Sequence, residues 1–81
     1  MLTFETDDDG TVFIHGDAAG LEALADQLKR LVATTPEGTF DHTHLMTPSW
    51  AGNELSEERH DPAARLIHHV KLYCWKGQRS L

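Results

Sequence analysis

The segment that decides the fold runs from Asp17 to Val32 and reads DAAGLEALADQLKRLV. Its apolar side chains recur every three or four positions, which places them on one face of an α-helix. This stripe consists of Leu21, Leu24, Ala25, Leu28, Leu31 and Val32. Asp17 is a residue type that caps the free backbone N–H groups of a first helical turn. We therefore expect one amphipathic helix whose apolar stripe packs against the rest of the protein.

Two short alternating runs before the helix predict a β-hairpin. The runs and the turn between them are Leu2–Thr6, Asp7–Gly10 and Thr11–His15. A three-residue loop with Gly10 at a positive φ pairs Phe4 with Ile14, and it keeps the charge of Glu5 from lying opposite a core residue. This register puts four apolar side chains on one face: Leu2, Phe4, Val12 and Ile14.

Two further strands are expected after the helix, at Thr39–Thr47 and Arg65–Lys76. The connection between them, residues 48–64, is a loop of a length that is usually functional, and residues 77–81 read as a frayed tail. The order β-β-α-β-β predicts the α+β class, with a small antiparallel sheet and one amphipathic helix packed on one face. The chain is short enough for a single domain, residues 1–81. The uncovered face of the sheet should show, in part, Phe13, His15, Tyr73 and Trp75.

The charge of the chain limits the classes of partner that it would bind. The formal net charge is −6, and all thirteen acidic residues lie between Glu5 and Asp61. Such a chain is a poor match for nucleic acid, and it would attract a basic partner. No apolar run approaches the length of a membrane span, and no secretory signal is visible. The lone Cys74 fits a reducing interior, so we expect a cytoplasmic protein.

A His-x-His pair is the first candidate site. His42 and His44 are two residues apart on a strand and point the same way, and His15 and His69 could join them on the open face. Four imidazoles would suit zinc, copper or nickel. The alternative is that these histidines are hydrogen-bonded surface residues. We expect no metal or other cofactor, and keep a small histidine-based metal-binding domain as the alternative function.

The sequence offers little for catalysis. It has no strained-turn nucleophile motif and no glycine-rich phosphate loop. Cys74 lies within an apolar strand and reads as a core residue, and Asp7–Asp9 lacks the ligand spacing of a calcium loop. We therefore expect no catalytic residues and no enzyme activity.

Trp50 is the second candidate site, because it stands on a loop that contains glycine. An indole there either covers the edge of the core or meets a partner, and aromatic anchors carry much of the energy of protein interfaces. The sequence leaves both readings open. The expected partner-binding set is Trp50, Asn53, Glu54, Glu57, Glu58, His42 and His44. A homodimer joined through Phe13, Tyr73 and Trp75 is a further possibility.

Three segments of the chain resemble immunity protein family 32. They are His15-Gly16-Asp17-Ala18-Ala19-Gly20-Leu21 with the leucine-rich helix after it, His42-Thr43-His44-Leu45, and Trp50-x-Gly52-x-x-Leu55. The resemblance spans about His15 to Leu72. It implies a small bacterial protein of polymorphic toxin systems that binds and neutralises a cognate toxin inside the producing cell. It brings no catalytic residues and assigns no role to the histidine pair. The acidic charge suits a basic toxin, which the sequence does not identify.

Overall fold

The structure is a computed structural model, and it describes residues 1–77. The described elements are β1 (Leu2–Thr6), β2 (Val12–Gly16), α1 (Ala18–Thr34), β3 (Thr39–Met46), the 3-10 turn η1 (Pro48–Trp50), β4 (Arg65–Leu66) and β5 (His69–Lys76). The predicted α+β class is confirmed. The expected last strand is divided in two, because Ile67 and His68 interrupt it.

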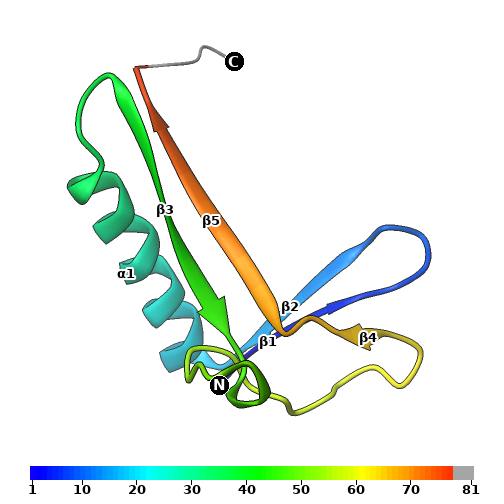
Figure 1. The fold of residues 1–81 in the computed structure, drawn as a ribbon. Helices are drawn as coiled ribbons and strands as arrows, with labels where there is room; N and C mark the ends of the chain where they lie inside the picture. The colour runs from blue at the N-terminus through cyan, green and yellow to red at the C-terminus, as the bar shows by residue number, and fades with distance from the viewer. Residues whose placement is uncertain (78–81) are drawn as a thin grey trace.

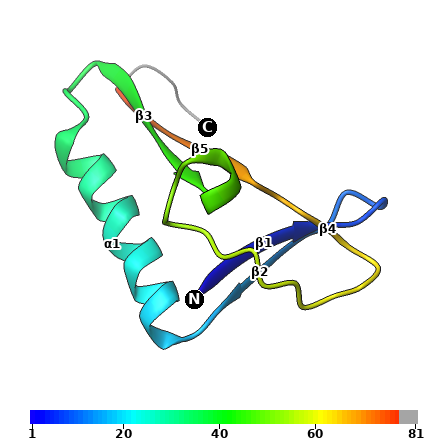
Figure 2. The same cartoon turned by 60° about the horizontal axis from the view of Figure 1, so that its bottom comes forward.

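The strands form two antiparallel sheets where one was expected. The first has the order β2-β1-β4 and the second is the β3-β5 ribbon. The two sheets leave a common base in different directions, and α1 runs alongside the ribbon (Figures 1 and 2). The interruption at residues 67–68 is what lets the chain leave one sheet and enter the other.

The hairpin has the register that the sequence predicts. Phe4 pairs with Ile14, and Gly10 has φ +83°. The Asp7 carboxylate stabilises the turn by accepting hydrogen bonds from two backbone N–H groups of the loop, at 3.0 Å each. The shared face is only half covered, however: Leu2 and Phe4 are buried, whereas Val12 and Ile14 remain 54% and 50% exposed.

Helix α1 begins as the sequence predicts. One carboxylate oxygen of Asp17 accepts a hydrogen bond from the Gly20 N–H at 2.7 Å and also contacts the N-terminal ammonium at 2.8 Å. The expected packing of the whole apolar stripe is wrong. Leu31 is buried and Leu24 packs on the core, but Leu21, Leu28 and Val32 stay exposed because they lie on a different side of the helix.

The core lies where the two sheets meet. It consists of Leu2, Phe4, Leu45 and Leu55, with Leu24, Ile67, Val70 and Leu72 packed around it. The long loop contributes Leu55 and is tied down, since the Leu55 N–H donates to the Met46 carbonyl and the Ser56 N–H to the Leu2 carbonyl. The loop forms one helical turn, the 3-10 turn at Pro48–Trp50, among its described residues.

Of the expected tail, residues 78–81 lie outside the described part of the chain. Within residues 1–77, α1 is too short and too polar to cross a membrane.

Candidate functional site

The β3–β5 ribbon has one covered face and one open face. Alternation turns Thr43 and Leu45 toward α1, so the even-numbered residues of β3 point the other way. The pairing brings His42 opposite Tyr73 and Phe40 opposite Trp75. We call the open side, together with the neighbouring Trp50, the aromatic face. Its residues are Phe40, His42, His44, Trp50, His69, Lys71, Tyr73 and Trp75.

Rings follow one another along this whole face. Ring centroids lie 4.6 Å apart for Phe40 and Trp75, 6.4 Å for Trp75 and Tyr73, and 5.2 Å for Tyr73 and His42. His42 and His44 (5.0 Å), His44 and His69 (5.0 Å), and His69 and Trp50 (5.8 Å) complete the series. The four largest rings, Phe40, Trp50, Tyr73 and Trp75, are 44–53% exposed. A contiguous surface of this kind is typical of an association site.

Two of the three histidines of the aromatic face form a pair. Nδ1 of His44 lies 2.8 Å from Nε2 of His69, so one ring donates and the other accepts when both are neutral. Burial, followed by the charges of His42, His69 and Lys71, lowers the pKa of His44. His44 therefore resists taking up a proton.

The predicted set of four metal-binding histidines does not assemble. His42, His44 and His69 share the aromatic face, but His15 lies on the other sheet beside Glu5. His68 is also engaged elsewhere, since its Nδ1 is 2.7 Å from the Thr47 hydroxyl. Among residues 1–77, no three His, Cys, Asp or Glu side chains are placed to hold a metal ion.

Trp50 stands on a tightly bonded turn. The Thr47 carbonyl accepts hydrogen bonds from the N–H groups of Trp50 (2.9 Å) and Gly52 (3.0 Å), and Ala51 has φ +68°. Gly52 is required here because a Cβ would lie 2.5 Å from the Met46 carbonyl oxygen. The indole itself is 53% exposed and rests against the rings of His68 and His69.

Two of the predicted acidic contact residues also build this turn. Glu54 accepts a hydrogen bond from the Met46 N–H at 2.9 Å, and the Glu57 carboxylate accepts from the N–H and hydroxyl of Ser49 at 2.7 and 2.9 Å. The side-chain and backbone hydrogen bonds from Ser49 lower the pKa of Glu57. Asn53 and Glu58 are exposed near the turn. The Glu54 and Glu57 carboxylates therefore stabilise the turn that carries Trp50, and they also place negative charge near it.

Sequence reasoning missed part of the site. Phe40 and Lys71 belong to the same face as His42 and His44, and strand alternation was the signal that could have grouped them. Phe13, which was expected beside Tyr73 and Trp75, belongs to the other sheet. The expected homodimer face of Phe13, Tyr73 and Trp75 is therefore not continuous.

A buried carboxylate, that of Glu5, fastens the long loop to the three-stranded sheet. Glu5 is 0% exposed, and its carboxylate accepts from the backbone N–H groups of His60 (3.1 Å) and Asp61 (3.4 Å) and lies 2.8 Å from His15 Nε2. The His15 and His60 rings stack at 4.5 Å. Burial raises the pKa of Glu5, but these hydrogen bonds and the nearby imidazole outweigh it, and the net shift is downward. The cluster fastens the loop to β1.

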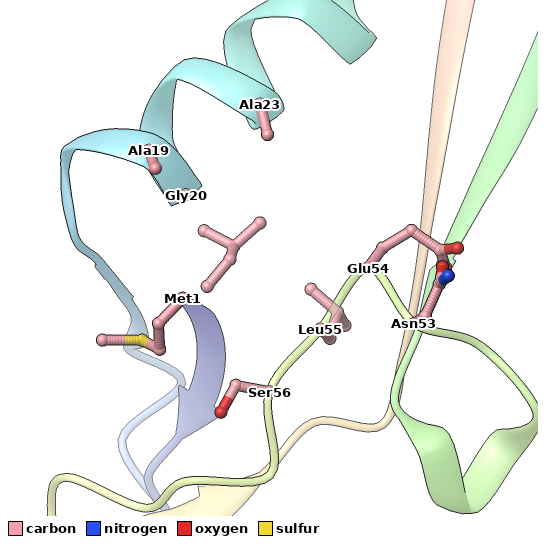
Figure 3. A pocket seen from close by; sticks show the side chains of 9 residues that line it. Met1, Ala19, Gly20, Ala23, Asn53, Glu54, Leu55 and Ser56 are labelled. Atoms are coloured by element: carbon pink, nitrogen blue, oxygen red, sulfur yellow. The ribbon is translucent and has the colours of Figure 1, made fainter.

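A separate groove lies between the start of α1 and the loop (Figure 3). Its volume is about 330 Å³, and its walls include Ala19, Gly20 and Ala23 from the helix and residues 53–56 from the loop. Glu54 is the one side chain with a titratable group among the residues that line it. This groove therefore offers little for acid–base or nucleophilic chemistry.

The fold and surface are those of a small α+β protein with one ring-rich, half-exposed face. The family model for Immunity protein 32 matches residues 11–70, and the chain belongs to that family. The match runs from the end of the hairpin loop into β5, which confirms the resemblance carried by the histidine and tryptophan segments. Comparisons with curated proteins and with solved structures returned no match.

Proposed function

We propose that this protein neutralises a cognate toxin in the cytoplasm of the cell that makes it, by protein–protein contact and without catalysis. Membership of the Immunity protein 32 family gives the general role. The single observation that supports the mode of action is the unbroken series of half-exposed rings on the aromatic face.

The proposed contact surface combines an apolar centre with a charged rim. Trp50 is the anchor, because a large ring in a desolvated pocket contributes more binding energy than the contacts around it. His42 and His44 supply polar bonds in the centre. Glu57 and Glu58, beside the Trp50 turn, form the rim, whereas Asn53 and Glu54 lie at its margin, where they also line the groove beside α1. Since the rim and the chain as a whole are acidic, a basic toxin would be drawn toward this surface.

The test uses the toxin domain encoded beside the gene for this protein as the candidate partner. The two proteins should co-purify, and cells that make both should survive. We expect Trp50→Ala to weaken binding by about 2 kcal/mol or more, as measured by calorimetry, while the fold is retained. The matched control is Val12→Ala, because Val12 is equally exposed (54% against 53%) and lies on the hairpin.

Two results would count against the proposal. Survival and binding that are unchanged by Trp50→Ala would place the contact surface elsewhere. Absence of both binding and protection, with the toxin active in the same cells, would remove the toxin-neutralising role for that partner.

For the rim, Glu58→Gln should slow association at low salt, whereas Asp9→Asn at the hairpin tip should not.

A further inference from the structure

Helix α1 has two apolar stripes, and only one is covered. The covered stripe includes Leu24 and Leu31, which pack toward the sheets. The second stripe lies about 100° around the helix, one residue further along the chain. We call it the outer stripe, and its members are Leu21, Ala25, Leu28 and Val32. Its three larger side chains are 46%, 44% and 52% exposed.

The spacing of the outer stripe is that of helices which pack on one another. Leu21 and Leu28 are seven residues apart, as are Ala25 and Val32, which is the repeat of paired helices. In an antiparallel pair of identical helices, Leu21 would face Val32 of the second copy and Ala25 would face Leu28. Ala25, the small residue of the stripe, thus meets the large Leu28, which lets the two surfaces interdigitate.

The charges beside the stripe point to the same arrangement. Glu22 and Lys29 border the outer stripe on one side and are also seven residues apart. Neither forms an ion pair within residues 1–77. In the antiparallel pair, Glu22 lies near Lys29 of the second copy and Lys29 near its Glu22.

From this self-complementarity we propose that the occupant of the outer stripe is a second copy of this chain. The result is a two-fold homodimer with its α1 helices antiparallel, in which the same surface of each copy meets the other. The proposal is independent of toxin binding, because the aromatic face lies on the opposite side of the ribbon from α1.

Sedimentation equilibrium of the full chain over a wide concentration range tests the dimer. We expect a monomer–dimer equilibrium in the unmodified protein. Leu28→Glu should raise the dimer Kd by roughly tenfold or more, because it places a charge in the apolar seam. Trp50→Ala, on the aromatic face, should leave the dimer Kd unchanged.

Charge reversal gives a second test that does not depend on the apolar residues. Lys29→Glu alone and Glu22→Lys alone should each weaken the dimer, and the double variant Glu22→Lys/Lys29→Glu should restore it. Circular dichroism confirms that each variant is folded. The proposal is overturned by a monomer at every concentration, by a dimer that Leu28→Glu leaves unchanged, or by a double variant as weak as the single ones.

Discussion

The histidines of the two sheets have different surroundings. In the three-stranded sheet, His15 lies 2.8 Å from the buried carboxylate of Glu5 and stacks on His60. On the ribbon, His44 contacts His69 and is surrounded by rings and the ammonium group of Lys71. The same residue type therefore fastens a loop in one region and forms an open surface in the other. Neighbouring charge and burial decide which role it has.

The two regions should also differ in what a substitution changes. Glu5 and the groups around it are buried, and a buried polar group that loses its partner destabilises the fold. The rings of the aromatic face remain half exposed, so their removal uncovers little and leaves few groups unpaired. Changes near Glu5 should therefore reduce stability, and changes on the aromatic face should reduce binding.

The largest effect is expected from Glu5→Ala. This substitution leaves the N–H groups of His60 and Asp61 without their acceptor, and it removes the carboxylate that lies 2.8 Å from His15 Nε2. We expect the greatest loss of stability of any single change discussed, measured as a fall in the midpoint of urea denaturation. His44→Ala on the aromatic face is the comparison, and its midpoint should move far less. Equal shifts for the two variants would show that the regions do not differ.

The conservative variant Glu5→Gln separates charge from hydrogen bonding. Because the pKa of Glu5 is lower in the folded protein than its ordinary value of 4.5, ionised Glu5 contributes stability above that value. This contribution is lost as the pH falls through the lower, folded pKa. Glu5→Gln should be less stable than the unmodified protein near neutral pH and should lose part of this acid dependence. If Glu5→Gln loses stability at low pH as much as the unmodified protein does, other carboxylates cause that loss.

A smaller effect on stability, with a second effect on binding, is expected from Gly52→Ala. The new Cβ would lie 2.5 Å from the Met46 carbonyl oxygen, so the turn must shift. Overpacking of this kind costs about 2 kcal/mol. Since Trp50 stands on the same turn, affinity for the toxin should fall as well. Ala51→Gly is the control, because Ala51 has a positive φ that glycine adopts readily, and it should preserve both stability and binding.

Local features of the fold were predictable from the sequence, and features that need distant partners were not. Asp17 and the turn at Gly10 act on residues a few positions away, so the helix start and the hairpin register followed from spacing. The division into two sheets depends on the interruption at Ile67 and His68, which no local pattern marks. The uncovered outer stripe was likewise unexpected, because periodicity shows that a face is apolar but not what covers it.

In the candidate site, too, the local features were predictable and those that depend on distant residues were not. Alternation correctly placed His42 and His44 on the open side, since strand geometry is local. Glu5 was missed because its partners His60 and Asp61 are 55 and 56 residues away. The role of Gly52 depends on the approach of Met46 through the folded turn, so only the structure reveals it.

The smallest expected effect is the response of the aromatic face to acid. The pKa of His44 is lower in the folded protein than its ordinary value of 6.5, so the unfolded chain takes up this proton first as the pH falls. The stability contributed by neutral His44 is therefore complete above the ordinary value and is lost as the pH falls toward the folded pKa. Protonation would also add positive charge beside Lys71, which opposes a basic partner. Urea midpoints and toxin affinity measured from about pH 8 to about pH 5.5 should both decline, and His44→Gln should flatten the decline. A His44→Gln curve that matches the unmodified protein would show that another group titrates in this range.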